Sequence, residues 1–341
     1  MSAGSQTFSN TTDIWNDLVK LSPMVWVEGA RAAVEMIQPV MDLYDVDPLD
    51  EFNRDYGNIA MSGFGNVIDE GADYIARFNN QGDTLSLTAI KRGDMFTITE
   101  DLVDGNKYRE IRLGMEDLGG SLYRTRARDA THNGFTFAFS TSYTDMDGRT
   151  NTNSLAKGSE AVFADTHTMG DGSTFDNNQA DTVIGETGLR NLEDLTVSFL
   201  DENGIPVTWG LGGKVLVTSI DTGMQHAALR LTTQPWNYQN TNRDINPFSD
   251  ARAYGGAYTH LPLHYLATTA TGAVDSTKYK YYYIVDRSLS KRCMIFGDHT
   301  NPSPMGPFRD IYNAGQLWQS KTRYDIGTLY AQHAAGCPAS T

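Results

Sequence analysis

The chain has 341 residues, of which 40% are hydrophobic and 20% are charged, which excludes a disordered polymer and allows two or three compact units. Its formal net charge of -15 disfavours tight binding to nucleic-acid phosphates or anionic lipid, and we interpret the acidic balance mainly as a source of solubility. Cys293 and Cys337 are too few for a disulfide framework, and we expect neither a signal peptide nor a membrane span, so a reducing compartment is the expectation.

Residues 1–60 are predicted to form an N-terminal arm. The first ten residues or so are small and polar, which is typical of a flexible terminus. A short helix is expected to end before Ser22-Pro23, because the residue before a proline disfavours helical geometry. A second helix is expected over 25–40, and residues 42–55 form an acidic connector. The second helix should bury one side, made of Val27, Ala30, Val34, Ile37 and Met41.

The pattern of residues 61–106 predicts a two-stranded hairpin, from about Asp69 to Arg92, followed by a further strand. Apolar and polar residues alternate over 73–78 and again over 84–89, and the intervening 79–83 has the composition of a turn. The hairpin has few large apolar side chains, and an isolated hairpin is marginally stable in water. It should therefore rest on another element, often another subunit; the alternative is two strands of an ordinary sheet.

Residues 107–131 predict one long helix. Its apolar residues recur at spacings of three and four, and charged residues fill the other side. Asp104 can cap its start, Asn133-Gly134 can end it, and Arg112 can pair with Glu116 one turn later. A glycine pair at 119–120 is tolerable there if another backbone lies close against it. The predicted core face is Tyr108, Ile111, Met115, Leu118 and Leu122.

The remainder mixes helices and strands without strict alternation, which predicts an α+β fold. Strands are expected over 135–139, 205–209, 215–217, 278–285 and 322–333, with 292–296 as a hairpin partner of 278–285. Helices are expected over 189–200 and 224–232, a turn over 201–204, and loops over 234–256 and 301–307.

No catalytic or metal-binding pattern is complete. His260 and His264 flank Pro262 and have no third ligand placed by the sequence, so structural roles are favoured. Asp145 to Gly148 begins like a calcium loop but lacks the rest of that pattern. Cys293 reads as a core residue. We therefore expect no enzyme activity, no cofactor and no metal.

The order of the parts (arm, projecting hairpin, long helix, mixed middle, closing strands) resembles the major capsid protein of tailed bacteriophages, which has the Johnson fold. Val162-Phe163, then His167, Gly172 and Asn177 or Asn178, are similar to a stretch of that family. The turn from Asp201 to Pro206 and the closing run from Lys321 to Gly327 also resemble family motifs, and Mu-type head subunits are nearest.

This resemblance implies a division of the chain. Residues 1–60 would be the N-arm, 61–106 the E-loop hairpin with flanking strands, 107–185 the P domain with its spine helix at 107–131, 186–290 the A domain, and 291–341 closing P-domain strands. The arm and E-loop would contact other subunits. The E-loop residues expected at that contact are Tyr74, Phe78, Asn79, Asn80, Leu85 and Leu87.

The resemblance further implies a structural protein of the virion capsid that assembles in the host cytoplasm into pentamers and hexamers of an icosahedral shell. A separate scaffolding protein, a portal and a decoration protein are the implied partners, double-stranded DNA would be held only by weak contact, and no membrane is involved. Two alternatives stay open: an encapsulin-like nanocompartment shell, and a β-rich soluble enzyme or binding module.

Overall fold

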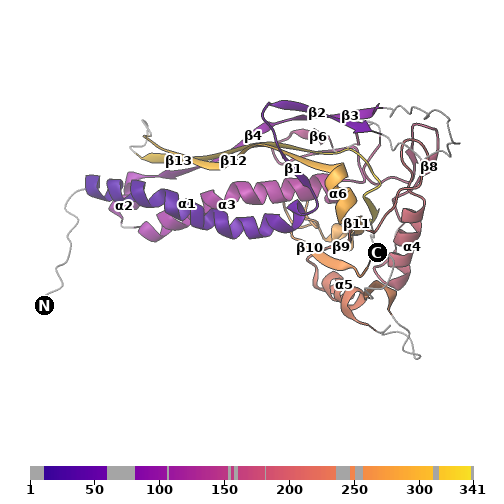
Figure 1. The fold of residues 1–341 in the computed structure, drawn as a ribbon. Coiled ribbons are helices and arrows are strands. Elements are labelled where there is room, and N and C mark those ends of the chain that lie inside the picture. Colours follow the sequence, from indigo (N-terminus) through magenta and orange to yellow (C-terminus); the bar gives the residue numbers. More distant parts are fainter. Residues whose placement is uncertain are drawn as a thin grey trace, which may run out of the picture. The chain divides into compact units, whose positions relative to one another are not determined.

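The computed structural model describes residues 11–59, 81–105, 107–152, 155–156, 160–180, 182–235, 246–249, 256–309 and 315–338. These residues form an α+β structure (Figure 1) in two compact units. Unit 1 comprises Met1–Gln38, Ala89–Ala127 and Asp298–Asp325; unit 2 comprises Pro39–Thr88, Arg128–Gly297 and Ile326–Thr341. None of the described helices is long and apolar enough to cross a membrane.

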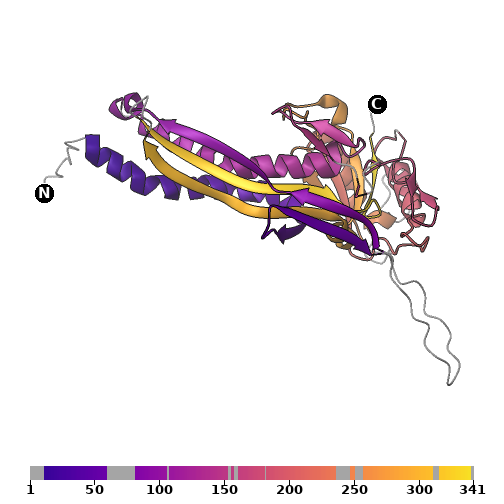
Figure 2. The same cartoon turned by 90° about the horizontal axis from the view of Figure 1, so that it is seen from above.

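Unit 1 is built from long elements. It contains most of α1 (Thr11–Met41) and α3 (Tyr108–Thr131), the short α2 (Glu100–Asp104), and β4 (Ile90–Ile98). It also holds most of β12 (Met294–Arg309) and β13 (Gln316–Thr328). The strands belong to a sheet of order β1-β12-β13-β4, in which β13 and β4 are antiparallel. Figure 2 shows these long strands running alongside the helices.

Alternation gives the β4–β13 pair one buried and one exposed face. Phe96 lies opposite Trp318, and Trp318, Ser320, Thr322 and Tyr324 are buried. This face covers an apolar core shared with the two long helices. The buried members of that core are Trp26, Ala30, Ile98, Val103, Ile111, Met115, Leu118 and Trp318.

Unit 2 is centred on a four-stranded sheet of order β10-β9-β11-β14. Its strands are β9 (Lys214–Ser219), β10 (Thr259–Leu263), β11 (Tyr282–Asp286) and β14 (Ala334–Cys337); β10 and β9 are parallel, and the other pairs are antiparallel. Every residue of β9, β11 and β14 is buried, as expected for strands covered on both faces. The helices α4 (Glu186–Val197), α5 (Thr222–Thr233) and α6 (Arg287–Cys293) contact this sheet.

Shorter elements complete unit 2. β2 (Asn53–Ile59) and β3 (Gln81–Thr88) form an antiparallel ribbon, and β5 (Ser142–Thr144) with β6 (Thr150–Thr152), and β7 (His167–Thr168) with β8 (Thr174–Phe175), form two small ones. The rest are β1 (Asp45–Pro48), α6 (Arg287–Cys293), the π-helix η1 (His132–Thr136), and the 3-10 turns η2 (Pro247–Ser249) and η3 (Ser276–Lys278).

One expected helix break and one expected strand are wrong for the same reason, namely burial that the local pattern does not reveal. α1 continues through Pro23, because the residues that follow pack against α3 and outweigh the loss of one helical hydrogen bond. The run 135–139 begins inside η1 and not a strand; Phe137 N–H donates to the carbonyl of His132, and Phe135 and Ala138 are fully buried. Tertiary packing overrides the two-residue alternation.

The closing strands also differ from expectation. The run 301–307, predicted as a loop, lies inside β12. Prolines are tolerated there because β1, its neighbour on one side, has only four residues and leaves most of that edge unpaired among the described residues. The predicted hairpin of 278–285 with 292–296 is wrong, since β11 pairs with β9 and β14, and α6 precedes β12.

Candidate assembly surfaces

The two long helices of unit 1 cross at glycines. A Cβ atom on Gly29 would lie 1.9 Å from the carbonyl oxygen of Glu116, and one on Gly119 would lie 2.1 Å from the carbonyl oxygen of Trp26. The backbones are therefore in direct contact, the condition under which a mid-helix glycine pair was predicted to be tolerable. Beside the crossing, Arg112 donates to Glu116 at 2.8 Å, as predicted, and to Glu28 of α1 at 2.9 Å. Gly29 follows Trp26 by three residues and precedes Ala33 by four, which places all three on one side of a helix. Nothing in the neighbouring sequence shows that this side contacts α3.

The predicted core face of α3 is largely buried. Ile111, Met115, Leu118 and Leu122 are between 1% and 3% exposed. Tyr108 is a correction, because it is the first residue of the helix and its side chain is 39% exposed. On α1 the prediction is confirmed for Ala30 and Ile37, which are buried, and wrong for Val27 and Val34, which are exposed; the other buried residues of this face are Trp26, Ala33 and Val40.

Arg126, near the end of α3 in unit 1, is a buried cation that the sequence did not single out. Its guanidinium donates to Asp298 at 2.6 and 3.1 Å, to Asn301 at 3.1 Å and to the hydroxyl of Thr322 at 2.7 Å, and lies 5.2 Å from the ring centroid of Tyr324. The residue is 4% exposed. Such a fully engaged cation fixes the helix against β12 and β13 and has no capacity left for catalysis.

α1 has a second apolar face that points away from its own core. Leu21, Met24, Val27 and Val34 are 53%, 68%, 50% and 36% exposed. Spacings of three and seven residues align them along one side of the helix. A helix that is apolar on opposite sides is normally buried on both. This stripe is therefore a candidate contact surface.

The exposed face of the β4–β13 pair is basic, whereas α2 is acidic. Lys91, Lys321 and Arg323 share that strand face, because Lys91 lies opposite Arg323 and Lys321 lies opposite Gly93. On α2, the exposed carboxylates are Glu100, Asp101 and Asp104. The sequence alone does not reveal the basic group, since the register that brings Lys91 beside Arg323 joins residues more than two hundred positions apart.

The β2–β3 ribbon of unit 2 changes the expected hairpin. β3, the strand predicted over 84–89, pairs with β2, so that Tyr56 of β2 lies opposite Leu85 of β3. Tyr74, Phe78, Asn79 and Asn80 lie outside the described residues. The predicted turn over 79–83 is wrong where it can be seen, because β3 already begins at Gln81.

Leu87 of β3 is also corrected. It is 2% exposed, and a Cβ on Gly297 or Gly327 would meet its side chain, so it packs within unit 2 and is not available to another subunit. Leu85 is half-buried and approaches the same Gly327. Gly297 and Gly327 leave room for the leucine side chains because they have no side chain of their own. The alternation of apolar and polar residues in β3 cannot predict this contact, because it involves residues far away in the chain.

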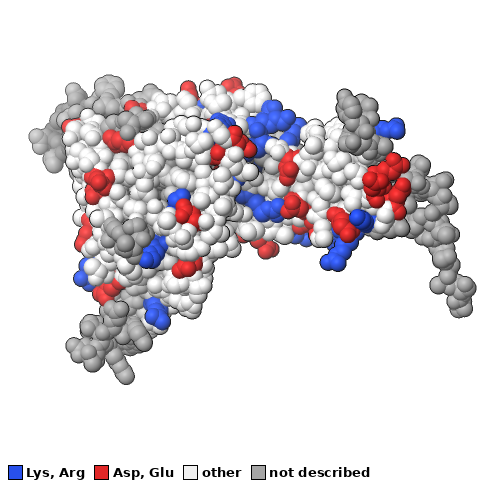
Figure 3. Space-filling view, turned by 180° about the vertical axis from the view of Figure 1, so that it is seen from behind, with Lys and Arg blue, Asp and Glu red and all other residues white. Residues whose placement is uncertain are grey.

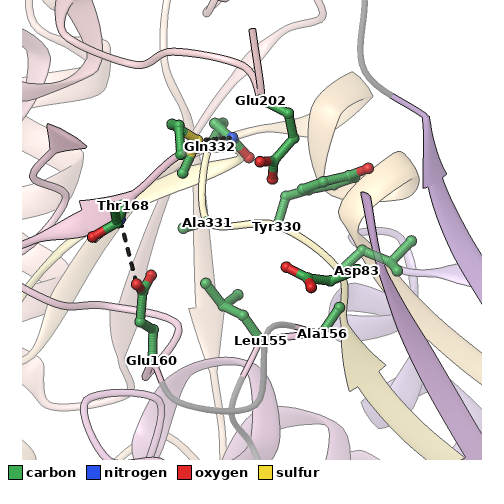
Figure 4. A pocket seen from close by; sticks show the side chains of 11 residues that line it. Asp83, Leu155, Ala156, Glu160, Thr168, Glu202, Tyr330, Ala331 and Gln332 are labelled. Carbon is green, nitrogen blue, oxygen red and sulfur yellow. Dashed lines mark hydrogen bonds between the residues drawn. The ribbon is translucent and has the colours of Figure 1, made fainter. Parts of the chain in front are cut away.

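A small cavity in unit 2 (Figure 4) gathers three carboxylates. Asp83, Glu160 and Glu202 line it with Tyr330 and backbone near Ala331. Its volume is about 20 Å³, which holds little more than one water molecule. Glu160 accepts from the Thr168 amide at 3.3 Å, and Glu202 accepts from the Gly170 amide at 2.9 Å, outside the lining set. The described carboxylates, cysteines and histidines form no group able to hold a metal ion.

A wider groove beside α4 contains an ion pair between a buried lysine and a half-buried glutamate. Lys214 donates to Glu193 at 2.8 Å, and the hydroxyl of Tyr258 donates to the same carboxylate oxygen at 2.9 Å. Burial and the neighbouring Glu193 carboxylate raise the pKa of Tyr258 well above its ordinary value. Trp209 and Pro206 form part of the groove wall. Lys214, Glu193 and Tyr258 satisfy one another, so this trio holds the groove wall together.

The residues of the family-like stretch meet in one buried hydrogen-bond network. The side chain of Asn177 donates to the carbonyls of Val162, Ala331 and Ala334, at 2.9 to 3.3 Å, and its oxygen accepts from the Ala164 amide at 3.0 Å. His167 bonds to that same oxygen at 2.9 Å and to Glu160 at 3.1 Å. This network ties a loop to the chain before β14, a structural role.

The other residues considered for chemistry are structural as well. His260 bonds the Thr218 hydroxyl at 2.8 Å, and burial lowers its pKa. Asp145 accepts from the amides of Asp147 and Arg149, both at 3.0 Å, as in a closed polar turn. Cys293 ends α6 and is buried, which raises the pKa of its thiol to about 12 and makes a thiolate nucleophile unfavourable.

Comparison with known proteins supplies the fold. No protein-family model and no curated protein sequence matches the chain. A solved chain from Gordonia phage Cozz is 10% identical, with a TM-score of 0.51 over 89% of this chain and 86% of that one. This likeness confirms the predicted α+β class in the arrangement of the tailed-phage capsid fold.

Two further similar structures come from particle shells. The capsid of the Cyanophage P-SCSP1u is 12% identical, with a TM-score of 0.48 over 88% of this chain and 87% of that one. A virus-like particle from Pyrococcus furiosus is 7% identical, with a TM-score of 0.48 over 93% of this chain and 98% of that one.

Proposed function

We propose that this chain is the major capsid protein of a tailed bacteriophage, which assembles with copies of itself into the icosahedral head shell around the genome. The observation that carries the proposal is the order of elements within the fold: a long N-terminal helix, an extended β2–β3 ribbon, the long α3 beside long strands, then a mixed unit around β9 and β11. That order is the one expected for N-arm, E-loop, spine helix and A domain.

The surfaces support an assembling protein. The stripe on α1 leaves four large apolar side chains more than a third exposed along one helix. Exposed apolar surface of this kind marks interaction sites, and a shell presents the same neighbour to every copy. Of the two concavities described above, one has a volume of about 20 Å³, and in the other Lys214 is paired with Glu193.

The finer division of the chain belongs to the same proposal. We assign 1–60 to the N-arm, 61–106 to the E-loop with its flanking strands, 107–185 to the P domain, 186–290 to the A domain and 291–341 to the closing strands. The partners proposed are a separate scaffolding protein, a portal, a decoration protein and weakly held double-stranded DNA, with assembly in the host cytoplasm. A likeness to Mu-type head subunits is part of the same proposal.

Electron microscopy of the purified full-length chain tests the proposal, together with light scattering behind size-exclusion chromatography. We expect capsomers or closed shells of tens of nanometres. A small soluble oligomer under all assembly conditions would contradict the proposal and favour a soluble binding module. Native particles that enclose protein cargo and no genome would identify a nanocompartment shell instead.

A further inference from the structure

The exposed side of α1 combines the apolar stripe with charged residues. The stripe consists of Leu21, Met24, Val27 and Val34. Lys20, Arg31 and Glu35 are also exposed, and at about 100° per residue they fall within roughly 60° of one another around the helix axis, on the same side as Met24. A surface that fits this side of the helix therefore has to match its charges as well as its apolar side chains.

The two ends of this surface carry opposite charges. Lys20 lies fifteen positions before Glu35, which separates them by roughly 22 Å along the helix. In a parallel pair of α1 helices each of these charges would face its own copy, which is unfavourable. In an antiparallel pair, Lys20 of each copy can face Glu35 of the other. The same arrangement sets Met24 opposite Arg31, whose aliphatic stem can cover it while the guanidinium stays in water.

The acidic α2 favours the same direction. It lies at the same end of unit 1 as the start of α1 (Figure 1 and Figure 2), and Figure 3 shows a compact group of Asp and Glu side chains at that end. A parallel pair of α1 helices would bring two such acidic ends together, whereas an antiparallel pair places them at opposite ends. Electrostatic repulsion therefore disfavours the parallel arrangement a second time.

We propose that α1 of one copy packs antiparallel against α1 of a second copy, across a two-fold axis that passes between Val27 and Glu28. The inference rests on the shell-forming function proposed above and deepens it by naming one contact between copies. Val27 then lies beside its own symmetry mate, and each stripe is covered by the other helix. Removal of apolar surface from water supplies the affinity, while the exposed ion pairs add little to it and select the direction. Because the contact is isologous, it joins copies in pairs and can link two rings of a shell.

Introduced cysteines test the pair and its direction. Both native cysteines are buried, so an exposed cysteine is the reactive thiol towards oxidised glutathione. Val27→Cys places two thiols beside the axis. Lys20→Cys and Glu35→Cys are assembled separately and also as a mixture of the two chains. Leu113→Cys is the matched control, because Leu113 is 52% exposed on α3 of the same unit.

Non-reducing electrophoresis measures the covalent dimer in assembled particles or, if none form, in the concentrated subunit. Val27→Cys should give at least about tenfold more dimer than Leu113→Cys. Lys20→Cys and Glu35→Cys should each stay monomeric alone, because identical positions lie roughly 22 Å apart, and should cross-link when mixed. Thermal unfolding of the reduced chains should be unchanged, since all these side chains are exposed.

Charge variants of the Val27→Cys chain test how the direction is selected. Glu35→Lys should reduce cross-linking about three- to tenfold, because the new lysine faces Lys20 of the other copy. Addition of Lys20→Glu exchanges the two charges and should restore the yield. Glu51→Lys alters the net charge equally at an exposed position of unit 2, and it should leave the yield unchanged.

Three outcomes overturn the inference. Cross-linking of Lys20→Cys or Glu35→Cys with its own copy would show a parallel pair. Normal particles without the Val27→Cys cross-link would show that the stripe does not meet its own copy, and the proposed shell function would still stand. Failure of the charge exchange to restore cross-linking in a folded chain would show that these charges do not face each other. Cross-linked pairs without particles would instead support the α1 contact and contradict the proposed function.

Discussion

Replacing Gly119 by alanine is expected to destabilise unit 1, although alanine is the better helix former. A Cβ atom at this position would lie 2.1 Å from the carbonyl oxygen of Trp26 and 3.1 Å from the backbone nitrogen of Ala30. These are helix backbone atoms, which cannot rotate aside as a side chain can. α1 would have to move by about 1 Å to restore an ordinary contact distance.

The magnitude follows from two opposing contributions. Alanine gains about 1 kcal/mol of helix propensity over glycine. Overpacking a well-packed interface costs about 1–3 kcal/mol, and the upper end applies because a rigid backbone is displaced. A gap of about 1 Å would also weaken the contacts of Trp26 and Leu118 in the same core. We expect a net loss of about 2 kcal/mol in the free energy of unfolding.

Gly120 provides a matched control one residue away. A Cβ there would meet a guanidinium nitrogen of Arg124 at 2.7 Å, which is the mobile end of a side chain, and its nearest backbone contact is the Gly29 oxygen at 3.4 Å. Gly120→Ala should therefore be neutral or stabilising by up to about 1 kcal/mol. Urea unfolding and hydrogen exchange of the α3 amides measure both. The reasoning is refuted if Gly119→Ala is as stable as Gly120→Ala.

Three further changes test other parts of the chain. Arg126→Ala should cost about 3–5 kcal/mol in urea unfolding, because it leaves Asp298 without its buried cation, and Arg126→Met with Asp298→Leu should recover most of it. Burial lowers the pKa of His132 from its ordinary 6.5 to about 3, so the unfolded state binds more protons than the folded state between these values. The free energy of unfolding should therefore fall as pH decreases from 7 towards 3, and His132→Gln should flatten that pH dependence. Replacing residues 61–80 by a Gly-Ser linker should preserve cooperative unfolding but abolish closed shells by electron microscopy, and normal shells would disprove an assembly role for this segment.

Helical periodicity was the most informative sequence signal. It gave α3 almost to the residue and four buried members of its core face, because a 24-residue amphipathic pattern is hard to satisfy in any other way. The same signal misassigned α1. Two apolar stripes there made Val27 and Val34 look like core, and the sequence could not reveal that Gly29 and Ala33 turn the helix towards α3.

Strand prediction failed where pairing is non-local. Alternation correctly indicated a strand around Leu85 and Leu87, but it assigned the nearest alternating segment as the partner. The partner is β2, which was predicted to be part of a connector because it contains charged residues such as Arg54 and Asp55. Arg126 was equally invisible as a buried residue, since its ligands lie more than 170 positions away. Such contacts depend on topology that no local window contains.

The net charge and the apolar stripe of α1 together constrain how copies can associate. At -15 per chain, two copies repel at long range, and added salt weakens that repulsion. Burial of Leu21, Met24 and Val27 against a neighbour does not depend on screening, because it removes apolar surface from water. Assembly should therefore become faster as ionic strength rises, because added salt screens the repulsion between copies while burial of the apolar stripe is retained.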